Sequence, residues 1–100
     1  MRAAMRLERA LLASAARAGA ALAIARHASV EWRSATFAGE RHVIEAEAPA
    51  GAALEAWLAS LGADAIRVPG HMVADLRTVA CARDGAAARV RIEGLTVALG

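Results

Sequence analysis

Lysine, asparagine, glutamine and tyrosine are absent from this 100-residue sequence, and only three residues are aromatic. All twelve basic residues are therefore arginine. A chain rich in alanine, arginine and glycine that avoids lysine and asparagine is typical of a GC-rich coding sequence. Codon supply already favours arginine here, so arginine alone is weak evidence for nucleic-acid binding. The net charge of +2 is small and fits almost any partner.

Cysteine is nearly absent as well. The single Cys81 excludes a disulfide within the chain, and it favours a reducing, cytoplasmic location. It has no second cysteine or histidine near it in the sequence, and it falls in the middle of a predicted strand. We therefore expect Cys81 to be a small buried hydrophobic residue rather than a nucleophile.

Long leucine-rich runs are also missing, which matters for the N-terminal segment. Residues 1–28 are rich in arginine and nearly free of acid, a composition that superficially resembles a transit peptide. Glu8 interrupts that pattern, and the segment continues directly into the first predicted strand, so we interpret it as part of the domain. Arg17 in its middle argues against a membrane span. A targeting role for these residues stays open at this stage.

The predicted core is thin, because much of the 58% hydrophobic content is alanine. A chain of this length forms one domain, residues 1–100, and buries about 60–65% of the surface that it exposes when unfolded. Alanine adds little buried area, at roughly 25 cal/mol per Å². Self-association would bury more apolar surface, so we expect a homo-oligomer.

Residues 2–28 predict a long helix, since they are rich in the strongest helix formers. At about 100° per residue, Leu7, Leu11 and Leu22 fall on one side of it. Four arginines gather on the opposite side as a basic stripe: Arg2, Arg6, Arg9 and Arg17. This stripe is the candidate surface for contact with an anion such as a nucleic-acid phosphate.

Residues 29–48 change to a period of two, which predicts a strand hairpin. A three-residue turn at 38–40 matches the apolar faces of the two strands and places Trp32 opposite Ala46. In this register Trp32 faces the core.

The second half of the chain predicts a helix and another hairpin. Apolar residues at helical spacing fill residues 51–62, and strands at 72–83 and 87–99 flank a strong turn signal at 84–85. The apolar residues of the last strand change phase at Gly94, which predicts a β-bulge there.

The order of elements is therefore αββαββ, an α+β fold. The simplest architecture is a four-stranded, mainly antiparallel sheet with both helices packed on one face. The other face would meet solvent or a second subunit.

Two histidines begin strands that topology brings to the same end of the sheet. His42 begins the second strand and His71 the third, and a right-handed crossover would align the two strand starts. The candidate ligand-binding residues at this end are Glu40, Arg41, His42, His71 and Asp75. Such a group offers an imidazole–carboxylate pair for acid–base work, or two imidazoles for a metal ion. Turn-flanking residues that stay in water are the structural alternative.

The sequence carries no HExxH spacing, no glycine-rich phosphate loop and no nucleophile elbow. Residues 32–37 and 68–75 resemble signatures of a small bacterial family, but they bring no activity with them. The leading hypothesis is a non-enzymatic interaction or assembly module that self-associates and takes protein partners. One alternative is a small-molecule or metal-binding protein, or a minor enzyme, that uses His42 and His71. The other is a nucleic-acid-associated protein that uses the arginine stripe.

Overall fold

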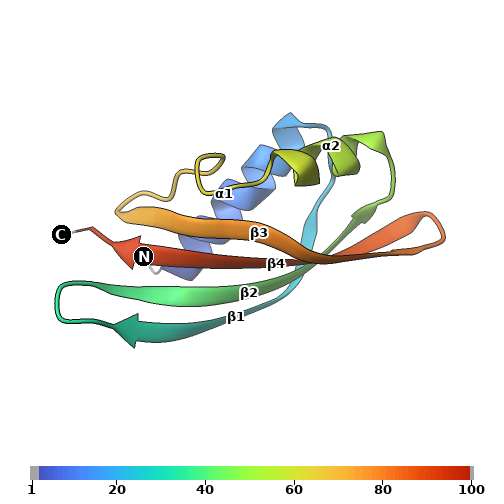
Figure 1. Ribbon diagram of the computed structural model, residues 1–100. Helices are drawn as coiled ribbons and strands as arrows, with labels where there is room; N and C mark the ends of the chain where they lie inside the picture. The colour runs from blue at the N-terminus through green and yellow to red at the C-terminus, as the bar shows by residue number, and fades with distance from the viewer. Residues whose placement is uncertain (1–2, 100) are drawn as a thin grey trace.

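The computed structural model describes residues 3–99, and it confirms the αββαββ order. The elements are α1 (Ala3–Arg17), β1 (Ala23–Arg33), β2 (Ala38–Pro49), α2 (Ala52–Ser60), β3 (His71–Asp84) and β4 (Ala87–Ala98). The strands form one sheet in the order β1-β2-β4-β3, and every neighbouring pair is antiparallel. Both helices lie on one face of this sheet (Figure 1). We call the other side the open face.

The α1 helix ends at Arg17, eleven residues earlier than the sequence predicts. Gly19 adopts a φ of 81°, and the Ala20 N–H donates to the Ala15 carbonyl while the Gly19 N–H donates to the Ala16 carbonyl. This pair of bonds is a Schellman cap, which glycine favours because it lacks a Cβ. The helix propensity of alanine suggests continuation, but the glycine ends the helix and residues 23–33 form a strand.

The first hairpin exists as predicted, but its turn lies earlier in the chain. The loop comprises residues 34–37, where the Ser34 hydroxyl accepts a hydrogen bond from the Phe37 N–H at 3.0 Å. Trp32 is consequently opposite Gly39 rather than Ala46. This shift turns Trp32 to the open face, so its predicted place in the core is wrong.

The predicted bulge at Gly94 is also wrong. β4 pairs with β2 without interruption from Val97 to Ala87. Register shifts occur instead in β1, near residue 25, and at two places in β3. The apparent change of phase arises because Leu95 and Val97 are apolar residues on the open face. A Cβ at Gly94 would lie 3.3 Å from Leu76 Cδ1, so the glycine leaves room for a core side chain.

The core lies between the sheet and the two helices. Leu7 and Leu11 of α1 and Trp57 of α2 pack against a centre that includes Ile44 of β2 and Ile92 of β4. The Trp57 indole N–H donates to Ser14 Oγ at 2.9 Å and thereby ties the two helices together. Within residues 3–99 no helix has the length and hydropathy needed to cross a membrane.

The molecule is elongated, with extents of 47 × 21 × 21 Å. One end carries the 34–37 turn, the start of β3 and the C-terminus, and the other end is the 84–87 turn (Figure 1). Residues 79–87 near the latter turn are all exposed. Cys81 is among them, so its predicted burial is wrong.

Candidate functional site

Four polar side chains from four different elements form one hydrogen-bonded series under α1. Glu8 Oε2 lies 2.8 Å from His27 Nδ1, and His27 Nε2 lies 2.9 Å from His42 Nδ1. The remaining ring nitrogen of His42, Nε2, lies 2.8 Å from Thr96 Oγ1. We call these four residues the buried polar chain. It links α1, β1, β2 and β4.

The sheet register brings these side chains together. His27 and Thr96 are diagonal neighbours of His42, one on each of the strands that flank β2. Their side chains all point to the face that α1 covers, and Glu8 follows Leu7, which belongs to the buried stripe of that helix. His42 and Thr96 are each 1% exposed, whereas the Glu8 side chain is 34% exposed. Water therefore reaches the chain at its Glu8 end.

The partners determine where the hydrogens lie when both imidazoles are neutral. An ionised carboxylate only accepts, so His27 Nδ1 carries a hydrogen and donates it to Glu8. His27 Nε2 then accepts from His42 Nδ1, and His42 Nε2 accepts from the Thr96 hydroxyl. Every bond in the series has one donor and one acceptor. All polar atoms of the two buried rings are thus satisfied, as buried polar groups require.

The pKa of His42 is lowered from 6.5 to about 4, chiefly by burial, because an imidazolium inside the protein loses its hydration. The positive charges of protonated His27 and His71 contribute smaller parts of the same lowering. His42 is therefore neutral in the folded protein near neutral pH. Both of its ring nitrogens are occupied, which leaves neither free for a metal ion or a substrate.

The predicted ligand-binding residues divide between the two faces of the sheet. β2 and β3 run parallel with β4 between them, so His42 and His71 do lie toward the same end. Glu40 and His71 line a common hollow of about 160 Å³, which Glu31 also lines. The Glu40 carboxylate accepts a hydrogen bond from Ser29 Oγ at 3.3 Å, and His71 Nδ1 lies 3.2 Å from the Pro69 carbonyl. His42 is buried in the polar chain.

Arg41 and Asp75 are on the open face, away from the histidines. Asp75 forms an ion pair with Arg77 at 2.9 Å, and Arg77 also reaches Glu93 at 3.5 Å. These residues form a surface charge cluster on neighbouring strands.

The arginine stripe of α1 is directed partly toward the 61–70 loop. Arg6 Nη1 donates to the Pro69 carbonyl at 2.6 Å, and Arg6 and Arg9 line a shallow hollow that Arg67 shares. Arg17 is the last residue of the helix. Arg2 lies outside the described residues.

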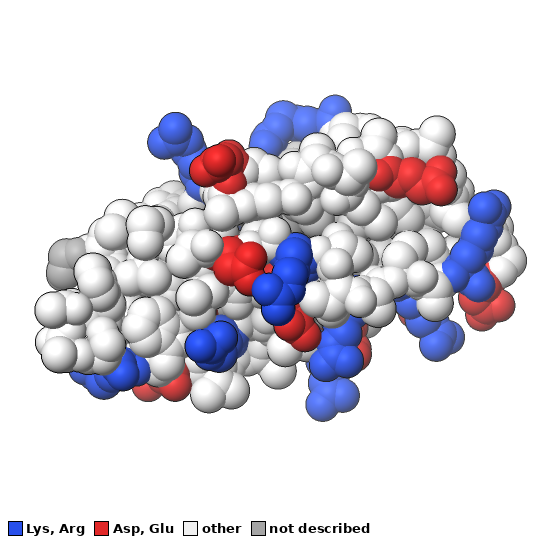
Figure 2. Space-filling view, in the orientation of Figure 1, with Lys and Arg blue, Asp and Glu red and all other residues white. Residues whose placement is uncertain are grey.

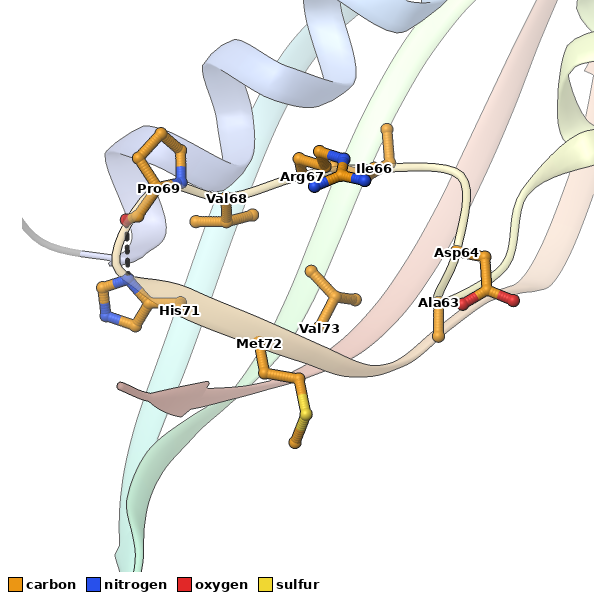
Figure 3. Close-up of a pocket in the computed structure, with 9 residues that line it drawn as sticks. All are labelled: Ala63, Asp64, Ile66, Arg67, Val68, Pro69, His71, Met72 and Val73. Carbon is orange, nitrogen blue, oxygen red and sulfur yellow. Dashed lines mark hydrogen bonds between the residues drawn. The ribbon is translucent and has the colours of Figure 1, made fainter. Parts of the chain in front are cut away.

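A hollow of about 470 Å³ lies between residues 63–69 and the start of β3. Figure 3 shows His71 at one end of it and Asp64 at the other, so its polar groups do not converge on one point. Nowhere in residues 3–99 do three or more histidine, cysteine or acidic side chains form a group that could hold a metal ion. In the buried polar chain the donors and acceptors face one another instead of a common centre.

Sequence reasoning missed His27 and Thr96. His27 fell within the helix predicted to end at residue 28, and Thr96 fell within an apolar strand. Interpreting Gly19 as a helix stop would have extended the first strand back to His27. The predicted turn at 38–40 would still have placed His27 on the face opposite Trp32, away from the core, so the turn at 34–37 was needed as well.

The open face has a distinct apolar region at one end. Trp32, Gly39, Val97 and Met72 form one row across all four strands. The Trp32 ring lies over Gly39, since a Cβ there would be 2.7 Å from Trp32 Cζ2. Further large apolar side chains are exposed at this end of the molecule. We call the following residues the apolar end: Val30, Trp32, Phe37, Met72 and Leu99.

Charged side chains gather elsewhere. Figure 2 shows most of them over the middle and right of the molecule, whereas the left end is mostly uncharged apart from blue and red groups at its lower edge. On the open face, Glu45 is opposite Arg26 on one side and Arg91 on the other, and Arg89 lies 3.9 Å from Glu47. The open face therefore has an apolar half and a half of mixed charge.

No protein-family model, curated protein or solved structure matches this chain. The fold and the site define an α+β protein whose helix-covered face holds a closed polar chain and whose open face carries an apolar end.

Proposed function

We propose that this protein is a non-enzymatic interaction module that self-associates through the open face of its sheet. The observation that carries the proposal is the apolar end. Met72, which is 49% exposed, ends the row that runs through Val97 and Gly39 to Trp32. Val30, which is 67% exposed, lies two residues before Trp32 on β1 and opposite Arg41. A contiguous apolar surface of this kind on a small domain is typical of a binding interface.

The Trp32 indole adds a second observation. Its Nε1 is buried, and it has no hydrogen-bond partner within residues 3–99. A buried N–H without an acceptor is costly, at about 1–3 kcal/mol. Because Nε1 is covered from solvent, the Trp32 side chain would have to move on association for an acceptor of a second molecule to reach it and remove that cost.

The shape and charge of the open face favour a second copy of this chain as the occupant. One long side of the molecule measures 47 × 21 Å, or roughly 1,000 Å², which compares with about 800 Å² per partner in a stable interface. A twofold axis through the apolar end would pack this patch against the same patch of a second molecule. The charged half carries acids and arginines in alternation, so it offers complementary ion pairs to a like surface.

The test measures association directly. Analytical ultracentrifugation of the wild-type protein up to about 100 µM should show a concentration-dependent dimer, which corresponds to an association free energy of at least about 5.5 kcal/mol. Met72→Glu should shift the protein to monomer, because the new carboxylate would be desolvated in the interface.

Met5→Glu is the matched control. Met5 is 53% exposed on α1, on the other side of the molecule, and the substitution makes the same chemical change. It should leave the dimer intact. A wild-type protein that is strictly monomeric at 100 µM, or equal effects of the two substitutions, would contradict the proposal.

We also propose a reducing, cytoplasmic setting for this module. The support is the lone Cys81, which is exposed and has no partner for a disulfide within the chain. Without added reductant, the purified protein should consume close to one equivalent of a maleimide, because the Cys81 thiol is exposed and free.

A further inference from the structure

The buried polar chain is the polar attachment of α1 to the sheet. Within residues 3–99, Glu8 is the α1 residue whose side chain hydrogen-bonds to a strand. The other polar contacts of the helix go to the 61–70 loop, through Arg6, and to α2, through Ser14. The apolar attachment is small, because the buried residues of α1 are two leucines and two alanines. The state of the chain therefore bears directly on whether α1 stays docked.

The chain accommodates one added proton. If a proton is added to His27 Nε2, that nitrogen becomes a donor to His42 Nδ1, and His42 donates from Nε2 to Thr96 Oγ1 instead. The bonds reverse direction, but each still joins one donor to one acceptor. The positive charge lies next to the Glu8 carboxylate.

A second proton cannot be added without the loss of a hydrogen bond in the buried polar chain. With both rings protonated, His27 Nε2–H and His42 Nδ1–H would face each other at 2.9 Å, so two donors would meet and no acceptor would lie between them. The two ring centroids are 5.1 Å apart, and the two positive charges would share a site buried from water. The hydrogen bond between the histidines must then break.

The charged groups around the two rings are few. Glu8 of α1 contacts His27, and the helix-facing sides of β1 and β2 present Glu31 and Glu40. His71 of β3 acts on His42 as a further positive charge when protonated. β4 contributes the uncharged Thr96. The two buried residues of α2, Leu54 and Trp57, carry no charge.

We propose that the buried polar chain is a proton-operated latch: entry of a second proton separates α1 from β1 while the four-stranded sheet remains paired. The proton enters at Glu8, where the chain meets water. The strands keep their own backbone ladders, which do not depend on the chain. The latch thus converts a fall in pH into exposure of the inner side of α1 and of the sheet beneath it.

Trp57 provides the reporter, because its indole donates to Ser14 of α1. A Trp32→Phe background leaves Trp57 as the one tryptophan in the sequence. Titration from pH 8 downward should shift Trp57 emission to longer wavelength with a midpoint between pH 6.5 and about 4. The far-UV circular dichroism of the sheet should persist through that midpoint. Unchanged emission down to pH 4, or emission and strand signal lost together, would overturn the proposal.

Glu8→Gln and Glu31→Gln form a matched pair in that background. Both remove one carboxylate charge from the space between α1 and the sheet, but of the two only Glu8 belongs to the buried polar chain. Glu8→Gln should raise the midpoint by roughly half a pH unit or more, because the positive charge on His27 loses its counter-ion. Glu31→Gln should move it much less. Equal shifts for the pair would refute the latch.

His42→Asn keeps a donor toward His27 and removes the second protonation site. Its Trp57 emission should stay constant over the same pH range. A transition that persists unchanged in a folded His42→Asn protein would count against the latch. If this variant does not fold, the Glu8/Glu31 pair still decides the question.

Discussion

His27 and His42 share one hydrogen bond, Nε2 to Nδ1 at 2.9 Å, with their ring planes tilted by 57°. This bond joins β1 to β2 through side chains under a helix, in addition to the backbone ladder of the same strands. A histidine pair of this kind is sensitive to protonation, because each ring changes from acceptor to donor when it binds a proton. The pKa of His42 determines in which direction the stability of the fold changes with pH.

The stability of the fold should fall as the pH is lowered from about 6.5 toward 4. The pKa of His42 is about 4 in the folded protein and near 6.5 when unfolded, so the unfolded chain binds more protons between these values. The contribution of neutral His42 to the free energy of unfolding is fully present above pH 6.5 and decreases as the pH falls. It amounts to at most about 3 kcal/mol. Urea denaturation at a series of pH values measures it, and His42→Asn should flatten the dependence. A His71→Asn protein, which keeps His42, should retain most of it.

Thr96→Val should destabilise the protein by about 1–3 kcal/mol, because it leaves His42 Nε2 buried without a donor. Thr78→Val is the matched control. Thr78 Oγ1 is buried and has no hydrogen-bond partner within residues 3–99, so a methyl group there should be neutral or stabilising by up to about 1 kcal/mol. Thermal unfolding of the two variants compares them. If both lose stability equally, the Thr96–His42 bond contributes nothing measurable.

Gly39→Ala should cost about 1–3 kcal/mol. A Cβ at this position would overlap the Thr96 carbonyl oxygen and press on the Trp32 ring. Gly62→Ala introduces the same methyl group where no atom lies within 4 Å, and should change stability by less than about 0.5 kcal/mol. Denaturant midpoints distinguish the two, and Trp32 fluorescence should change in Gly39→Ala alone. An unperturbed Gly39→Ala protein would mean that the indole does not rest on this glycine.

The order of elements was predictable because local signals mark most boundaries, although the end of α1 was placed eleven residues too late. The change from a helical to an alternating pattern, the Asp84-Gly85 turn and the stop at Gly62 together define αββαββ. The helix-covered core followed from the same patterns. Long-range assembly added the strand order, which places β4 between β2 and β3.

Register and the functional chain were not predictable in the same way. From the sequence alone, the strands of the first hairpin can pair through a turn at 38–40 or at 34–37. The Ser34 side chain stabilises the second turn, but a single serine is a weak sequence signal for it. His27 was assigned to a helix because alanine propensity outweighed Gly19. The contact between His27 and His42 depends on both corrections, so it emerges only in three dimensions.

The two halves of the chain are near copies in layout. Each consists of a helix, an outer strand and an inner strand, and the inner strands β2 and β4 both have 12 residues. They meet antiparallel at the centre of the sheet, which is the relation that a twofold axis between them requires. The order of elements and strands therefore has the layout of two αββ units about a pseudo-twofold axis, although α1 has 15 residues and α2 has nine. Either half produced alone would expose one unpaired edge of its inner strand, and that edge would be available to pair with the same strand of a second copy.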